Sequence, residues 1–121
     1  MKTFVVLSAV FGFLGVALGA FGAHVVRGRV TPGDLEIFET GVRYQMYHAL
    51  AILAVAWVQT RVPDPAIGVA GWLFAAGIVI FSGSLYLLVF SGVRWLGAVT
   101  PLGGLCFLAG WAALAWGVLR G

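Results

Sequence analysis

The sequence predicts an all-α integral membrane protein whose four transmembrane helices form an up-down-up-down antiparallel bundle. Of its 121 residues, 62% are hydrophobic and only 9% are charged, and the mean hydropathy is +1.07. Soluble domains contain about 45–50% apolar and about 25% charged residues. This composition therefore excludes a water-soluble fold, a disordered chain and a nucleic-acid binder. The few charges leave four long uncharged stretches, which are residues 3–26, 44–60, 65–93 and 95–119.

The lengths of these stretches match membrane-crossing helices, which need about 17–25 apolar residues. Because the stretches are continuously apolar rather than alternating, helices are favoured over the strands of a β-barrel. The predicted helices cover residues 3–25, 42–60, 66–90 and 98–119. The first is longer than the apolar region of a signal peptide, which has about 7–15 residues. We expect one domain over residues 1–121, with both termini on the same side of the membrane.

The connection after the first helix contains the signals of a helix start. Thr31 is a predicted N-cap, Pro32 occupies the first helical position, and Asp34 lies in the positively polarised first turn. Three apolar side chains then share one face of the helix: Leu35, Phe38 and Val42. We therefore expect a short amphipathic helix over residues 32–41, lying at the membrane interface before the second span.

Charges and prolines shape the next two connecting elements. Glu39 and Arg43 are four residues apart, which predicts an ion pair on the surface of the helix. Pro63 and Pro65 prevent helix continuation through the 61–65 turn. That turn should therefore be tight and stiff.

The last helix has two alternative beginnings. If Thr100 is the N-cap and Pro101 the first helical residue, residues 101–119 are long enough to span, and residues 91–99 form an interfacial loop. The alternative is a continuous helix that is kinked at Pro101. We favour the first, because proline at the first helical position costs no hydrogen bond.

Small residues repeat along one face of the first and last helices. In the first helix they are Ser8, Gly12, Gly15, Gly19 and Gly22, and in the last they are Gly103, Cys106, Gly110, Ala113 and Gly117. Steps of three and four residues are typical of left-handed helix crossing near about +20°. Helices associate in lipid by close packing and polar contacts, so we predict tight backbone approach along both faces. These glycines do not follow a strand and therefore form no nucleotide motif.

Polar side chains gather at one end of the predicted bundle. Placed by depth, they fall on the side of the 26–43 connection: His24, Glu39, Tyr44, Gln45, Tyr47, His48, Ser82, Ser84, Tyr86 and Thr100. Because polar groups are costly in lipid, Gln45 and His48 should face the bundle interior. Tyr44 and His48 share one face of the second helix. Ser82 and Tyr86 share one face of the third, and we expect these two faces to meet.

Four segments of the chain match the sequence pattern of a known family. They are residues 22–24, 39–50, 81–86 and 100–104, which read GAH, ETGVRYQMYHAL, FSGSLY and TPLGG. Through these segments the chain resembles the YgdD/YwdK family of small bacterial inner-membrane proteins, which has a relative among animal transmembrane proteins. The resemblance covers nearly the whole chain and implies four membrane helices and a domain of unknown function. It implies no reaction, ligand or catalytic residue.

The polar cluster leaves three hypotheses for function. The first is a structural network of hydrogen bonds in a non-catalytic scaffold or accessory subunit of a membrane assembly. The second is a binding or conduction site for a small solute, ion or lipid headgroup, with His24 and His48 titrating and Glu39 at its mouth. The third is ligation of a haem iron by His24 and His48. We favour the first, since buried polar residues are usually paired with one another. No carboxylate lies within any predicted span, which argues against a proton relay in the second.

Catalysis, cofactors and orientation receive little support from the residues. No helical pair of metal ligands and no Ser-His-Asp or Cys-His set can be assembled, so we expect no enzyme activity, metal or cofactor. The expected surroundings are the lipid bilayer of the inner membrane, with a second copy or a membrane-protein partner. Four basic residues lie on the side of the 27–43 connection and three on the other. Around the first helix alone, the basic residues favour a cytoplasmic 27–43 connection.

Overall fold

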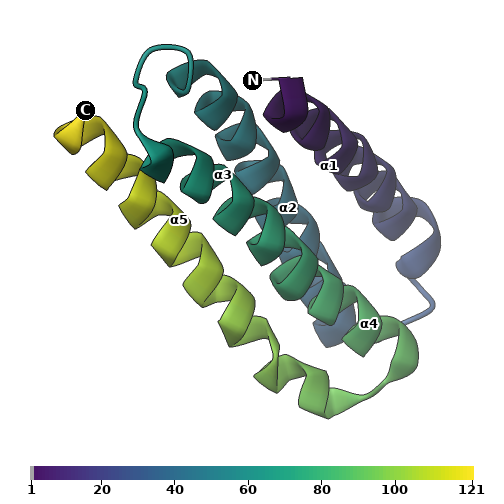
Figure 1. The fold of residues 1–121 in the computed structure, drawn as a ribbon. Helices are drawn as coiled ribbons and strands as arrows, with labels where there is room; N and C mark the ends of the chain where they lie inside the picture. Colours follow the sequence, from purple (N-terminus) through teal and green to yellow (C-terminus); the bar gives the residue numbers. More distant parts are fainter. Residues whose placement is uncertain (1) are drawn as a thin grey trace.

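The computed structural model describes residues 2–121, and these residues fold into helices without a β-strand. Four long helical rods lie side by side, and both termini lie at the same end (Figure 1). The first rod consists of α1 (Lys2–Phe21) and the π-helical turn η1 (Gly22–Val26), and the second is α2 (Pro32–Val58). The third rod consists of α3 (Pro65–Gly77), the π-helical turn η2 (Ile78–Ser82) and α4 (Gly83–Ser91). The fourth consists of the 3₁₀ helix η3 (Arg94–Ala98) and α5 (Thr100–Arg120). The predicted all-helical fold is confirmed.

The predicted interfacial helix over residues 32–41 is not a separate element. It is the first part of α2, which continues without interruption to Val58. The predicted start is right: Pro32 lies in the first turn, and the Thr31 hydroxyl accepts a hydrogen bond from the Asp34 N–H at 3.1 Å. Phe38 is fully buried rather than immersed in lipid, so the apolar face of this segment packs inside the protein.

Three expectations about the connecting elements differ from the structure. Residues 94–98 form the short helix η3 rather than a loop. The last helix begins at Thr100, one residue before the predicted first helical residue, so Val99 occupies the cap position and Thr100 makes no capping hydrogen bond. The Thr100 hydroxyl donates instead to the Leu96 carbonyl. Pro101 lies in the first turn of α5, where its missing N–H costs nothing. Arg43 donates a hydrogen bond to the Thr40 hydroxyl at 3.1 Å, and it forms no ion pair with Glu39 in the part of the chain described.

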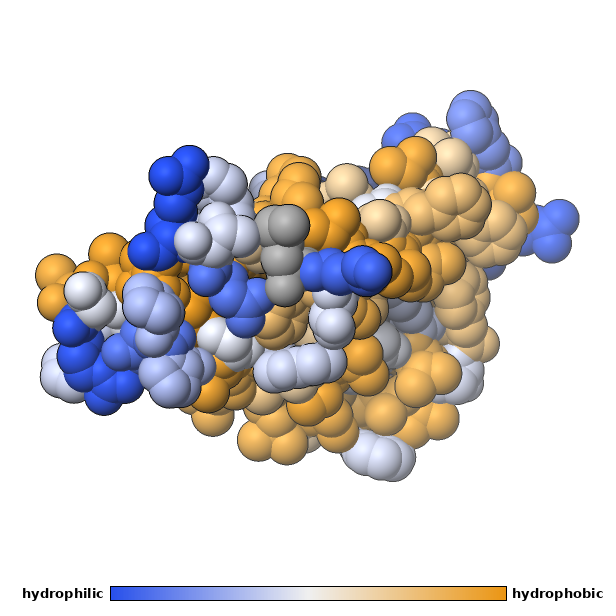
Figure 2. Space-filling model, turned by 45° about the horizontal axis from the view of Figure 1, so that its top comes forward, coloured by the Kyte–Doolittle hydropathy of each residue, from blue (hydrophilic) through white to orange (hydrophobic). Residues whose placement is uncertain are grey.

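Three of the rods are long and apolar enough to cross a membrane. They are Lys2–Val26, Pro65–Ser91 and Arg94–Arg120. Figure 2 shows hydrophilic residues mostly at the two ends of the molecule, with hydrophobic residues covering the sides between them. The rod formed by α2 is long but less apolar than the other three, because its first half contains the polar residues identified above.

The rods pack in a defined order around two buried apolar clusters. α1 packs against α2, and α5 packs against α3 and η2. The larger cluster includes Phe4, Ile52 and Phe74, while the smaller cluster, nearer the 27–31 connection, includes Phe38 and Leu88. Along α2, Gln45 and His48 lie between these clusters.

Small residues bring the rods into close contact at most of the predicted positions. Ser8, Gly15, Gly22, Gly103, Gly110 and Gly117 are buried. At Gly103 the neighbour is backbone rather than a flexible side chain, because a Cβ there would lie 2.8 Å from the Cα of Phe81. Gly19 makes only ordinary contact, since a Cβ there would lie 3.4 Å from Val42. The prediction is wrong for Gly12, because a Cβ there would meet no atom within 4 Å.

Candidate functional site

Gln45 connects three helices through its side-chain amide. Its Nε2 donates to the Phe11 carbonyl of α1 at 2.9 Å, and its Oε1 accepts from the Tyr86 hydroxyl of α4 at 2.7 Å. Gln45 is only 3% exposed. The prediction that this residue faces the interior is therefore confirmed, and each end of its amide has a partner.

Serine hydroxyls make a second set of contacts between the rods. Ser8 of α1 donates to the Ala49 carbonyl at 2.8 Å, and Ser82 of η2 donates to the Gly41 carbonyl at 2.6 Å. Ser84 contacts the Thr100 hydroxyl and so joins the start of α4 to the start of α5. These bonds use backbone carbonyls as well as side chains, which is how polar groups in membrane helices find partners.

The predicted polar face of the third rod, with Ser82 and Tyr86, does meet α2, but it meets a different face of α2 from the one predicted. Ser82 and Tyr86 contact Gly41 and Gln45 of α2 rather than Tyr44 and His48. The cause is Gly41, where a Cβ would lie 2.9 Å from Cε1 of Tyr86. Without a side chain there, the third rod approaches α2 along this line.

His48 has a hydrogen-bond partner at each ring nitrogen. Its Nδ1 lies 2.8 Å from the Tyr44 carbonyl oxygen, and because a carbonyl can only accept, Nδ1 carries the proton. Its Nε2 then accepts the indole N–H of Trp111 at 3.1 Å. The ring also stacks on Phe107, with ring centroids 3.6 Å apart and planes 7° from parallel. Both nitrogens of this neutral tautomer are occupied, so neither is free to bind a metal.

An apolar groove of about 530 Å³ opens beside this histidine, between α2 and α5. Tyr44 and Phe81 form part of its wall, and Leu108 and Trp111 lie opposite on α5. Gly104 also lines the groove, and a Cβ there would meet no atom within 4 Å. We call this space the α2–α5 groove.

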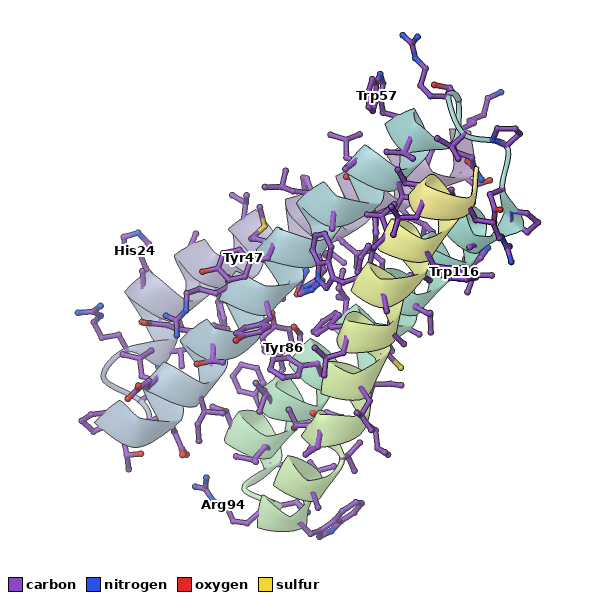
Figure 3. The ribbon with its side chains drawn as sticks, turned by 90° about the vertical axis from the view of Figure 1, so that its left-hand side faces the viewer. His24, Tyr47, Trp57, Tyr86, Arg94 and Trp116 are labelled. Atoms are coloured by element: carbon purple, nitrogen blue, oxygen red, sulfur yellow. The ribbon has the colours of Figure 1, made fainter. Side chains whose placement is uncertain are left out.

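Three of the predicted cluster residues lie outside the polar network. His24 is exposed on η1 and points away from the rods, whereas Tyr86 lies between them (Figure 3). Tyr47 is 55% exposed. Glu39 is half-buried and makes no side-chain hydrogen bond among residues 2–121. Since His24 and His48 are not brought together, the geometry gives no support to a haem between them. No group of three metal-ligating side chains occurs in the residues described.

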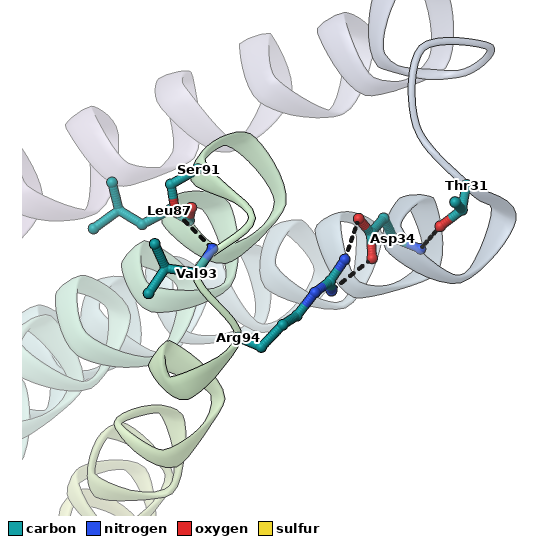
Figure 4. A network of polar contacts seen from close by, with 6 residues as sticks. All are labelled: Thr31, Asp34, Leu87, Ser91, Val93 and Arg94. Carbon is teal, nitrogen blue, oxygen red and sulfur yellow. Dashed lines mark hydrogen bonds and ion pairs between the residues drawn. The ribbon is translucent and has the colours of Figure 1, made fainter.

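Two ion pairs that sequence reasoning missed close the opposite ends of the structure. Arg94 forms a two-pronged pair with Asp34, at 2.9 and 3.0 Å, close to the capping bond of Thr31 (Figure 4). At the end that holds the termini, Arg120 forms an equivalent pair with Asp64, at 2.9 and 2.8 Å. Each pair joins residues more than 50 positions apart.

The Asp64 pair also changes the acidity of its carboxyl group. The guanidinium of Arg120, together with the backbone N–H of Ala66, lowers the pKa of Asp64 from 3.8 to about 2. Asp64 is the N-cap of α3. One carboxylate therefore caps one helix and holds the end of another.

Comparison with known proteins agrees with this membrane architecture. The family model described as "Protein of unknown function (DUF423)" matches residues 18–104. The UPF0382 membrane protein YwdK of Bacillus subtilis is 46% identical over 92% of this chain and 91% of its own length. A UPF0382 membrane protein of Staphylococcus aureus is 43% identical over 94% and 93%. The UPF0382 inner membrane protein YgdD of Escherichia coli K12 is 43% identical over 95% and 88%. No solved structure matches the chain.

The matched region contains the elements that form the site. Residues 18–104 include all of α2, the whole third rod and the start of α5. The resemblance inferred from the four sequence segments is thereby confirmed, because relatives named YwdK and YgdD match over most of their length. The chain belongs to the DUF423 family, and its relatives YwdK and YgdD are named as membrane proteins.

Proposed function

We propose that this protein is a four-span inner-membrane protein that acts as a non-catalytic accessory subunit of a membrane assembly. The observation that carries the proposal is the internal pairing of its buried polar groups. Among the buried side-chain atoms of residues 2–121, only Gln59 Oε1 lacks a hydrogen-bond partner. Side chains that are already paired with one another stabilise a fold, and they are poorly placed to bind a solute or transfer a proton.

The fourth crossing in this proposal is α2. Its polar residues Gln45 and His48 are buried against neighbouring rods rather than exposed to lipid. The rod has 27 residues, which corresponds to about 40 Å at 1.5 Å per residue and exceeds the hydrocarbon thickness of about 30 Å. A helix packed between apolar rods crosses the membrane with them, even though its own hydropathy is low.

The positions of the termini separate four crossings from three. Four crossings place Lys2 and Gly121 on the same side of the membrane, and three place them on opposite sides. Cysteines would be introduced near each terminus and at Gly33, which is exposed just after the 27–31 connection and leaves room for a side chain. In a Cys106→Ser background, they would be labelled with an impermeant thiol reagent in intact cells. We expect the cysteines at the two termini to give the same result, and the cysteine at Gly33 to give the opposite one. Labelling of only one terminus would contradict the four-span arrangement.

The same labelling decides the orientation. Arg27 and Arg29 follow the first helix directly, and basic residues close to a span favour the cytoplasmic side. We propose that the 27–31 connection faces the cytoplasm and the termini face outward. Protection of a cysteine at Gly33 in intact cells supports this orientation, and its labelling would reverse it.

The α2–α5 groove is the surface proposed to receive a helix of the partner. Its wall is apolar, and Gly104 leaves room beside α5 for close approach of another helix backbone. Trp111 lines the groove and is 47% exposed, and tryptophan is one of the residue types that most often anchor protein interfaces. These properties suit a transmembrane helix better than a polar solute.

Site-specific crosslinking tests this role. A photoreactive amino acid would replace Leu108, which lines the groove and is 68% exposed, and in a matched control Phe13, which is 75% exposed on α1. We expect a single protein adduct of defined mass from Leu108 in native membranes and none from Phe13. The adduct should disappear when Gly104→Trp fills the groove. Adducts with lipid only, or with a second copy of the chain, would contradict an accessory role.

A further inference from the structure

A second cavity lies at the end of the structure opposite the termini, apart from the polar network and the α2–α5 groove. It has a volume of about 370 Å³ and lies between the end of the first rod and the end of α4. Its apolar wall consists mainly of Phe21, Val25, Val26, Val89 and Phe90. Ligand sites in proteins have volumes of about 300–1,000 Å³, so this cavity is large enough for part of a small ligand.

One charged side chain, Arg29, lines this apolar cavity. It forms no ion pair among the residues described, in contrast to Arg94 and Arg120, each of which holds an aspartate. The neighbouring Arg27 is also exposed and unpaired in the same part of the chain, but it does not line the cavity. The cavity thus combines an apolar wall with one uncompensated guanidinium.

The location of the cavity relative to the membrane supplies the next constraint. Phe21 and Phe90 belong to rods that are apolar enough to cross the bilayer, and Arg29 lies just beyond the end of the first. The apolar wall is therefore at the level of the acyl chains, and the guanidinium is at the level of the headgroups. Basic pockets between membrane helices at this level bind anionic headgroups.

We propose that this cavity binds one anionic phospholipid of the adjoining leaflet. The Arg29 guanidinium pairs with the phosphate of the headgroup, for which its planar donors are well suited. The upper part of one acyl chain lies against Val25 and Phe90. A free phosphate would leave the apolar wall unused, and a lipid without net charge would leave the arginine uncompensated.

Native mass spectrometry of the full chain provides the test. The protein would be reconstituted in vesicles of equal parts phosphatidylcholine and phosphatidylglycerol, released in mild detergent and analysed for retained lipid. We expect one phosphatidylglycerol per chain in the wild type. Arg29→Gln should reduce this retention about tenfold, as expected for loss of one hydrogen-bonded charge. Arg27→Gln, the matched control, should retain the lipid.

A further variant tests the apolar part of the site. Val25→Trp adds bulk to the cavity without changing the charge, and it should reduce retention as Arg29→Gln does. Thermal unfolding in lipid-free detergent would show that the variants are folded, as expected for side chains at the protein surface. Equal losses in Arg27→Gln and Arg29→Gln, equal retention of the two lipids, or full retention by Val25→Trp would each overturn the proposal.

Discussion

The indole N–H of Trp111 donates to Nε2 of His48 across the space between α5 and α2, at 3.1 Å. The Tyr44 carbonyl accepts the other ring proton. His48 is 5% exposed, so few water molecules could replace either partner. The tryptophan therefore completes the hydrogen bonding of the one buried histidine in the described residues and joins two rods that otherwise meet through aromatic side chains.

Trp111→Phe should destabilise the protein, because it leaves Nε2 of His48 without a donor. An unpaired buried acceptor costs about 1–3 kcal/mol, whereas hydrogen bonds between membrane helices contribute about 0.6 kcal/mol on average. We expect a loss of about 1 kcal/mol in the free energy of unfolding, measured by detergent titration in mixed micelles. Trp95→Phe, at a residue that is 68% exposed, should change it little. Equal effects would show that the indole N–H has no specific role.

Alanine substitutions at Gly103 and Gly104, two adjacent glycines of α5, should have opposite effects on the free energy of unfolding. Gly103→Ala places a methyl group against the Phe81 backbone, at 2.8 Å from its Cα, so the rods must separate. We expect a loss of about 1–3 kcal/mol, as in other overpacked sites. Gly104→Ala meets no atom within 4 Å and should be neutral or gain about 0.5–1 kcal/mol from helix propensity. The same detergent titration compares them, and similar losses would contradict the described contact.

Tyr86→Phe should weaken the connection between α2 and α4. The variant removes the hydroxyl that donates to Gln45 Oε1 at 2.7 Å and leaves that buried oxygen unpaired. The expected loss is about 1 kcal/mol. Tyr47→Phe is the matched control, since Tyr47 is 55% exposed. If removing the Tyr47 hydroxyl lowers the free energy of unfolding as much as removing the Tyr86 hydroxyl does, the network does not stabilise the fold.

The Asp64–Arg120 pair should make stability depend on pH in acid. Because the pKa of Asp64 falls from 3.8 to about 2 on folding, the folded state favours the carboxylate. This contribution is present above pH 3.8 and is lost as the pH falls towards 2. Asp64→Asn preserves an N-cap residue and removes the charge. Thermal scans should therefore show a smaller difference in unfolding temperature between Asp64→Asn and wild type at pH 2 than at pH 6. The same difference at both pH values would contradict a stabilising pair.

The sequence was most informative where the signal is local. The capping of α2 by Thr31 follows from the residues next to it, and the burial of Gln45 follows from the cost of a polar group in lipid. The close contacts at Gly103 and Gly110 follow from steps of three and four residues on one face. Each of these predictions depends only on residues within a single helix.

Features that depend on the rotation of one helix against another could not be read from spacing. Nothing in the sequence distinguishes Trp111 from other tryptophans in apolar spans. Its hydrogen bond to His48 depends on the rotation of α5 about its own axis. The pair between Arg94 and Asp34 depends on how the second, third and fourth rods pack together, because its two residues lie in the second and fourth. The π-helical turn η2 interrupts the regular helical spacing of the third rod, and spacing alone did not predict it.

The protonation of His48 tests most directly whether the buried polar residues are structural. Nitrogen-15 solid-state NMR of the protein in lipid bilayers at pH 7 distinguishes the two neutral tautomers from the imidazolium. We predict a neutral ring with the proton on Nδ1, and with an Nε2 signal that shifts in Trp111→Phe. A doubly protonated ring, or a proton on Nε2, would contradict the network and reopen the case for His48 as a site of binding or proton transfer.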